Sequence, residues 1–256
     1  MSDGFARIAF VGKGGAGKSL IAGTYARLLA ARGEPVLAVD SDPMPGLALS
    51  IGIPSTDAGI PDEAVEENPE EKGRRYRLCL PAREAVERYA ATGPDGVRFL
   101  QFGKLRGGPA SLMRSQTAFL EILDGLPPDG WHVIGDLPGG TRQPFFGWGR
   151  FAHTVVVVAE PMAKSLLSAR RLARLALAKE APLVVAVASK VREPGDAEMV
   201  TARTGLPVIG AVPWDDAVAE AERHGFAPID AAPESPGVRA VISLVDRLQA
   251  GEEKSA

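Results

Sequence analysis

The feature that most constrains the fold is the segment GKGGAGKS at residues 12–19, which matches the pattern G-x-x-x-x-G-K-[ST]. An apolar run at residues 6–11 precedes it and an amphipathic stretch at 18–32 follows it, so a predicted strand leads into a predicted helix. Glycines let the backbone N–H groups of such a loop turn inward around phosphate oxygens, at the positive end of the helix dipole. The predicted phosphate-binding residues are Gly12, Gly14, Gly15, Ala16, Gly17, Lys18, Ser19 and Leu20.

Short β-branched runs alternate with longer helical patterns along the rest of the chain. Strands are predicted over residues 6–11, 35–39, 97–102, 132–136, 154–159, 183–188 and 208–212. Helices are predicted over 18–32, 115–126, 163–180, 197–204, 217–224 and 238–250. This alternation predicts an α/β fold, with a mostly parallel sheet of seven or eight strands flanked by helices.

The length of 256 residues fits one domain over residues 1–250, followed by a frayed tail at 251–256. Residues 55–78 are charged and irregular, which predicts a surface excursion. The net charge of −3 gives no general attraction to nucleic acid or anionic membrane. Cys79 has no second cysteine to pair with, the N-terminus lacks a secretory pattern, and the apolar runs are too short to span a bilayer. We therefore expect a cytoplasmic protein.

Carboxylates follow two of the predicted strands. Asp40 and Asp42 end one strand and lie two residues apart, while Asp136 ends another and is followed by Gly139 and Gly140. Carboxylates at such places suit Mg²⁺, which keeps several waters and is often bound through them. The alternative for all three aspartates is a turn at the end of a strand.

Lys13 is a second lysine in the loop, five residues before Lys18, and KGGAGKS resembles the deviant phosphate loop K-G-G-x-G-K-[ST] of the MinD/ParA ATPases. This resemblance extends over roughly residues 5–250. It implies ATP and Mg²⁺ as cofactors and an ATP-dependent homodimer, in which Lys13 crosses the interface to the partner's nucleotide. The alternative for Lys13 is a solvated loop lysine.

The resemblance also implies roles for the acidic residues and for Lys18. Lys18 binds the β- and γ-phosphates and the Ser19 hydroxyl binds Mg²⁺. Asp42 orients the attacking water, Asp40 helps to hold the Mg²⁺ shell, and Asp136 acts on Mg²⁺ through water. Together with Lys13, the implied catalytic residues are Lys18 and Asp42; the implied metal residues are Ser19, Asp40, Asp42 and Asp136.

Two segments bear on the base of the nucleotide. The sequence SKVR at residues 189–192 lacks the aspartate of the guanine-reading pattern N-K-x-D, which disfavours GTP. Pro213, Trp214 and Asp215 resemble the adenine loop of the family, where backbone groups read the base. Capping of the following helix by Asp215 or Asp216 is an alternative that can coexist with this role.

Residues 97–123 and 160–176 resemble the branch of accessory ATPases that insert nickel into carbon monoxide dehydrogenase. That branch carries C-x-C after a glycine pair, whereas this chain reads PASLM at residues 109–113, so the thiolate route to a soft metal is absent. His132, His153 and His224 are scattered and are predicted to be surface or packing residues, and Met113 a core or interface residue.

The resulting functional prediction is a MgATP-hydrolysing dimer that acts on a client protein, with a metalloenzyme as one candidate. The alternatives are a positioning or partition ATPase and a nucleotide-binding module with little turnover. DNA binding would need an exposed basic patch, and residues 170–174 form only a modest one. Membrane binding would need a basic amphipathic C-terminal helix. Neither DNA nor a membrane is therefore expected as a partner. An aromatic cluster of Phe145, Phe146, Trp148 and Phe151 predicts either core packing or a docking patch for a partner.

Overall fold

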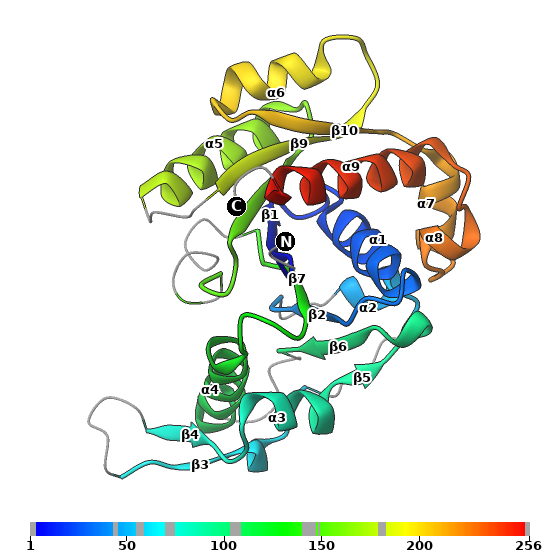
Figure 1. Ribbon diagram of the computed structural model, residues 1–256. Coiled ribbons are helices and arrows are strands. Elements are labelled where there is room, and N and C mark those ends of the chain that lie inside the picture. Colours follow the sequence, from blue (N-terminus) through cyan, green and yellow to red (C-terminus); the bar gives the residue numbers. More distant parts are fainter. Residues whose placement is uncertain are drawn as a thin grey trace.

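The protein, seen as a computed structural model, is built on one main sheet (Figure 1). The structure describes residues 4–42, 46–54, 59–69, 75–102, 109–139, 147, 149–178 and 183–253. Its strands are β1 (Arg7–Gly12), β2 (Val36–Asp40), β5 (Ala91–Thr92), β6 (Arg98–Gln101), β7 (His132–Asp136), β8 (Thr154–Ala159), β9 (Leu183–Val191) and β10 (Val208–Pro213). They form an 8-stranded sheet in the order β10-β9-β8-β1-β7-β2-β6-β5. All neighbours pair in parallel except β5, which runs antiparallel to β6. The predicted α/β fold and each predicted strand are confirmed.

Helices cover both faces of this sheet. They are α1 (Lys18–Ala31), α2 (Leu47–Ser50), α3 (Ala82–Tyr89), α4 (Pro109–Gly125), α5 (Ala163–Ala178), α6 (Asp196–Thr204), α7 (Asp216–Arg223), α8 (Pro228–Ala231) and α9 (Pro236–Glu253), with short 3₁₀ turns η1 (Asp62–Ala64) and η2 (Pro94–Gly96). The helix predicted from residue 115 begins earlier, at Pro109, since proline suits the first turn of a helix. α9 continues to Glu253, within the predicted frayed tail, and residues 254–256 lie outside the described part.

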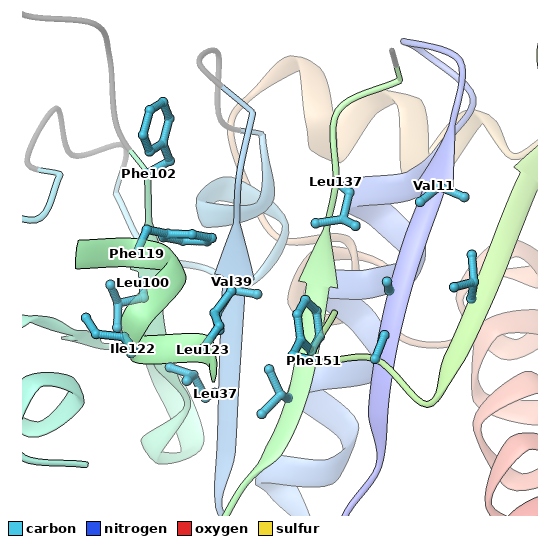
Figure 2. Packing of buried hydrophobic residues seen from close by; sticks show 14 of the residues in the cluster. Val11, Leu37, Val39, Leu100, Phe102, Phe119, Ile122, Leu123, Leu137 and Phe151 are labelled. Carbon is cyan, nitrogen blue, oxygen red and sulfur yellow. The ribbon is translucent and has the colours of Figure 1, made fainter. Parts of the chain in front are cut away.

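Alternate residues of the central strands enter two separate cores. One core contains Ile8 and Phe10 of β1 and packs against α1 and α9. The other contains Val39 of β2 and packs against α3, α4, α5 and α6. Figure 2 shows α4 laying its apolar face over the β2 and β6 side of this second core, with Phe119 and Leu123 pointing inward. This double burial explains why the strand sequences are continuously apolar rather than alternating.

The charged stretch at residues 55–78 contains more structure than predicted. β3 (Val65–Glu67) and β4 (Tyr76–Leu78) form an antiparallel pair beside α4. Tyr76 is buried under the guanidinium of Arg114, whose Cζ lies 4.5 Å from the ring centroid, and the carboxylate of Glu121 accepts a hydrogen bond from the Leu78 N–H at 2.6 Å. The prediction of a surface excursion did not include this pair of strands, because strands of three residues are too short to show a period in the sequence.

The aromatic cluster is only partly described. Phe151 is buried in the second core, where its ring would meet a Cβ placed on Gly135 at 2.6 Å. The core alternative is therefore confirmed for Phe151. Phe145, Phe146 and Trp148 lie outside the described residues.

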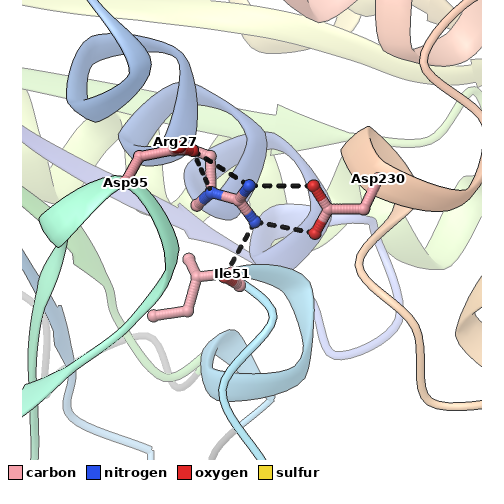
Figure 3. Close-up of polar contacts among 4 residues, drawn as sticks. All are labelled: Arg27, Ile51, Asp95 and Asp230. Carbon is pink, nitrogen blue, oxygen red and sulfur yellow. Dashed lines mark hydrogen bonds and ion pairs between the residues drawn. The ribbon is translucent and has the colours of Figure 1, made fainter. Parts of the chain in front are cut away.

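A buried arginine joins four distant segments of the chain (Figure 3). Arg27 of α1 donates two hydrogen bonds of 2.8 Å to the carboxylate of Asp230 in α8 and one of 3.0 Å to Asp95 in η2. It also donates to the carbonyl of Ile51, immediately after α2, at 3.1 Å. One side chain therefore links the helix after the phosphate loop to η2, to α8 and to the residue that follows α2.

Candidate functional site

The glycine-rich loop connects the end of β1 to the beginning of α1, as predicted. Gly15 and Gly17 have φ angles of 82° and 90°, in the left-handed region that favours glycine. A Cβ on Gly12 would lie 2.3 Å from the carbonyl oxygen of Val158 in the neighbouring strand. The glycines are therefore required both by the turn of the loop and by its close contact with β8.

Ser19 and Asp136 meet at the beginning of α1. The Ser19 hydroxyl donates to Asp136 Oδ2 over 2.5 Å, and Lys18 is buried beside them. Asp136 Oδ1 is buried and has no hydrogen-bond partner among the described residues. Burial raises the pKa of Asp136 to about 6, although Lys18 and the Ser19 hydroxyl act in the opposite direction. A buried carboxylate oxygen beside a hydroxyl is a chemically suitable pair for a hard cation.

Asp40 lies opposite Asp136 on the adjacent strand, and burial followed by the charge of Asp136 raises its pKa to about 7. Its carboxylate accepts hydrogen bonds from the backbone N–H groups of Asp42 at 2.9 Å and of Gly46 and Leu47 at 3.0 Å. Asp40 therefore ties the backbone at Asp42 and the beginning of α2 to the end of β2. Its predicted role in a Mg²⁺ shell stays a prediction.

Asp42 lies half-buried at the carboxyl end of β2, two residues beyond Asp40. Gly46, directly before α2, lies close to the start of α1, because a Cβ on Gly46 would lie 3.1 Å from the Ser19 hydroxyl oxygen. The structure thus brings the predicted water-orienting carboxylate to the same edge of the sheet as Ser19 and Asp136. Its catalytic role stays a prediction.

Gly139 follows β7 and packs directly on the phosphate loop. A Cβ at this position would lie 2.4 Å from the Gly12 carbonyl oxygen and 3.0 Å from the Gly14 nitrogen. Gly140, the second glycine of the pair that follows Asp136, lies outside the described residues.

Lys13 is exposed on the outer side of the loop. Its ammonium group donates a long hydrogen bond of 3.5 Å to the carbonyl of its neighbour Gly14. The predicted contact with a second subunit stays a prediction.

A pocket of about 210 Å³ runs from the phosphate loop to α7. It is lined by Gly15, Gly17, Lys18, Ser19, Leu20, Ser189, Lys190, Val212, Pro213, Trp214, Asp215, Val218, Ala219 and Glu222. The structure therefore brings the predicted base-binding residues Pro213, Trp214 and Asp215 into one pocket with Lys18 and Ser19.

Asp215 is the N-cap of α7. Its Oδ1 accepts hydrogen bonds from the N–H groups of Ala217 at 2.9 Å and Val218 at 3.4 Å, and its Oδ2 accepts one from the Gly237 N–H at 2.7 Å. Burial alone would raise the pKa of Asp215, but these hydrogen bonds and one from Ser235 together lower it. The capping alternative is confirmed, and its carboxylate fixes α7 against α9.

Two residues of the pocket wall were missed by the sequence reasoning. Lys190 donates a 2.5 Å hydrogen bond to the Gly15 carbonyl and forms an ion pair with Glu160 at 3.3 Å, so it joins the phosphate loop to the strand ends. Glu222 lines the pocket from α7. The spacing of 218, 219 and 222 on one face of the predicted helix was the available signal for Glu222.

The residues discussed as metal ligands elsewhere in the chain stay apart. His132 is buried, while Cys79, His153 and His224 are exposed. In the described part of the chain, no three His, Cys, Asp or Glu side chains gather into a metal cage made by protein alone. Met113 is exposed in the first turns of α4, which leaves the interface alternative for it. No helix in the described ranges combines the length and the apolar character needed to cross a membrane.

Comparisons with known proteins agree with this geometry. Residues 8–229 match the family model described as the CobQ/CobB/MinD/ParA nucleotide binding domain. The chain is 27% identical over 242 residues to the carbon monoxide dehydrogenase accessory protein CooC of Rhodospirillum rubrum, covering 89% of this chain and 90% of that protein. It is 28% identical over 236 residues to an uncharacterised ATP-binding protein of Methanocaldococcus jannaschii, covering 86% and 89%. The solved structure of the septum site-determining protein MinD with Mg-ADP, from Pyrococcus horikoshii, superposes with a TM-score of 0.73 at 19% identity, covering 98% and 99%.

Proposed function

The chain belongs to the CobQ/CobB/MinD/ParA nucleotide-binding family, and from this premise we propose that it is a Mg²⁺-dependent ATPase that cycles as an ATP-gated homodimer and acts on a client protein. The deviant phosphate loop places it with the MinD/ParA type, close to CooC. Hydrolysis, dimerisation and the client belong to the proposal.

The observation that carries the proposal is the arrangement of Ser19 and Asp136 at the phosphate end of the pocket. The Ser19 hydroxyl and the buried Asp136 Oδ1, which has no hydrogen-bond partner in the described ranges, are oxygen ligands of the kind that Mg²⁺ prefers. Mg²⁺ usually takes its remaining ligands from phosphate oxygens and water, so an all-protein cage is not required. Ser19 and Asp136 would hold Mg²⁺ at this point, where it would neutralise negative charge on the triphosphate.

The residues of this chain would bind and orient the triphosphate around that point. The turned backbone of the loop supplies N–H donors, and buried Lys18 supplies a positive charge beside the phosphates. Asp42, whose backbone N–H donates to the Asp40 carboxylate, orients the attacking water. Gly139 contacts the loop backbone directly, so a change at the phosphates can reach the segment after β7.

The proposal of a dimer depends on Lys13. It is exposed at the loop, where a second subunit can receive its side chain. A cation supplied in trans to a dry phosphate site can accelerate phosphoryl transfer by roughly 10³–10⁵-fold. The exposed position of Lys13 therefore supports a role in the partner's nucleotide site.

The client is proposed from the CooC relationship, which covers most of both chains. A metalloenzyme is a suitable candidate, but the C-x-C route to carrying its metal is missing from residues 109–113. Within that stretch, Ser111 donates a hydrogen bond to Asp62 at 2.8 Å, and Leu112 and Met113 are exposed. The proposed task is therefore remodelling of the client rather than thiolate transfer of a metal to it.

The test compares Lys13→Ala with Lys164→Ala, which removes an exposed lysine from α5. We expect Lys13→Ala to bind ATP normally, but to lose phosphate release and ATP-dependent dimerisation, while Lys164→Ala keeps all three. Turnover and dimerisation that both persist in Lys13→Ala would refute the crossing role. If the wild-type protein binds ATP without releasing phosphate, it is a binding module instead of an ATPase.

The client can be captured with Asp42→Ala, which should bind ATP and stay in the closed dimer. Proteins retained by this variant with ATP and released with ADP are the candidates. Normal turnover by Asp42→Ala would contradict its catalytic assignment.

One observation favours the positioning alternative. The arginines of the predicted basic patch, Arg170, Arg171 and Arg174, are exposed on α5. DNA retention that weakens steeply with salt would support this alternative, and its absence would reject it. The apolar face of α9 packs into the core, which leaves it unsuited to membrane binding.

A further inference from the structure

The wall of the pocket contributed by α7 carries one charged side chain, Glu222. Val218, Ala219 and Glu222 share the face of α7 that lines the pocket. We propose that Glu222 is a specificity-determining residue, whose carboxylate accepts a hydrogen bond from the exocyclic amino group of the purine. This inference rests on the proposed function. It adds that a side chain, and not only the backbone, recognises the amino group of the base.

The other charged groups of the same wall are already engaged. Asp215 uses both carboxylate oxygens to hold backbone N–H groups of α7 and α9. Lys190 bonds to the Gly15 carbonyl and to Glu160. Both side chains therefore bind other groups of the protein, and neither is the best candidate to bind a base.

Glu222 differs from them, because its carboxylate forms no hydrogen bond within the part of the chain that the structure describes. Its outer side is exposed to solvent, whereas burial against the pocket raises its pKa and the nearby charge of Lys190 opposes this shift. A partly desolvated carboxylate without a donor is stabilised by a ligand that supplies an N–H group.

Trp214 adds a planar indole ring to the lining of the pocket, and Lys190 Nζ lies 5.8 Å from its centroid. Its indole Nε1–H donates to Asp216 at 2.9 Å, which fixes the ring, and the guanidinium carbon of Arg192 lies 4.4 Å from the ring centroid. Arg192 stands where the guanine-reading pattern carries its aspartate. The group that accepts a hydrogen bond from the nucleobase is therefore supplied by helix α7 and not by the residue that follows β9.

Adenine has the required donor in its 6-amino group. One hydrogen bond to a charged acceptor at a partly exposed site is worth about tenfold in affinity. The preference of the protein for ATP over the triphosphate of unsubstituted purine riboside, which lacks only this amino group, measures the contact directly.

The experiment is calorimetric titration of wild-type protein, Glu222→Ala and Glu222→Gln with Mg²⁺ and either triphosphate. The wild type should bind ATP about tenfold more tightly than the purine analogue, Glu222→Ala should lose this preference, and Glu222→Gln, which keeps one acceptor oxygen, should retain part of it. Glu220→Ala is the matched control, since Glu220 lies on the same helix but pairs with Arg223 and His224; it should keep the full preference.

Equal binding of the two triphosphates by the wild type, or an unchanged preference in Glu222→Ala, would overturn the inference while leaving the ATPase proposal intact. A parallel titration of the wild type with GTP tests the base, and tighter binding of GTP than of ATP would overturn the assignment to adenine. Failure of the wild type to bind any of these nucleotides would count against the proposed function itself. Thermal unfolding of each variant without nucleotide confirms that the change acts on binding and not on folding.

Discussion

Replacement of Arg27 by methionine tests whether the buried arginine stabilises the fold around the site. The methionine keeps an unbranched apolar stem but removes the guanidinium group. Arg27 makes four hydrogen bonds of 2.8–3.1 Å, to Asp230, Asp95 and the Ile51 carbonyl, and only 6% of its side chain is exposed. Its loss leaves two carboxylates facing each other across the vacated position (Figure 3).

The size of the effect follows from the exposure of the partners. Removing one member of a fully buried ion pair costs about 3–5 kcal/mol. Asp95 and Asp230 are 38% and 51% exposed, so water can hydrate both carboxylates once the arginine is gone. We therefore expect a loss of about 2–3 kcal/mol in the free energy of unfolding, or roughly 5–10 °C in Tm for a chain of this size.

The matched control is Arg32→Met, one turn further along the chain, where Arg32 bonds to Asp246 at 2.9 Å with 41% and 60% of the two side chains exposed. An exposed pair of this kind contributes about 0–1 kcal/mol. Urea unfolding of both variants, followed by circular dichroism, measures the two losses. Equal losses, or a loss below about 1 kcal/mol for Arg27→Met, would refute the argument that burial decides the strength of this contact.

Three further predictions concern the loop, the sheet and the metal. Gly139→Ala should destabilise the protein by about 1–3 kcal/mol and weaken ATP binding, because its Cβ would lie 2.4 Å from the Gly12 carbonyl oxygen. Gly14→Ala is the control, since its Cβ meets nothing within 4 Å, and it should leave the unfolding of the nucleotide-free protein unchanged. Similar unfolding of both variants would contradict the steric argument. Burial lowers the pKa of His132, whose Nδ1 accepts a hydrogen bond from the Ala6 N–H at 2.9 Å, so its contribution to stability is present above about pH 6.5 and is lost as the pH falls through its folded pKa. Unfolding between pH 7 and 5 should accordingly depend less on pH in His132→Gln, and an unchanged slope would reject this assignment. Removal of Mg²⁺ with EDTA should stop phosphate release, and addition of excess Mg²⁺ should restore it; turnover that continues in EDTA would argue against the metal site.

The phosphate loop and the central strands could be predicted because their information is local. The turn of the loop requires glycine at positions 15 and 17, where φ is positive. The apolar runs of β1, β7 and β8 indicate burial on both faces, whatever the place of each strand in the sheet. The strands that the sequence did not reveal are short. The pair β3 and β4 and the edge strand β5 contain two or three residues each, and pairing with a neighbour, rather than their own pattern, makes them strands.

The candidate site likewise has features that nearby residues determine and features that depend on contacts between distant segments. The amino-acid sequence by itself determined the fold class, the loop that can surround a phosphate and the aspartates at the strand ends, because each depends on residues close together in the chain. Only the tertiary structure decided that Ser19 donates to Asp136, 117 residues away, that Arg27 holds Asp230, 203 residues away, and that Glu222 faces the same pocket as Lys18. Burial follows from local composition, whereas a polar contact between distant segments depends on strand order and on the way each helix packs, which a local pattern does not contain.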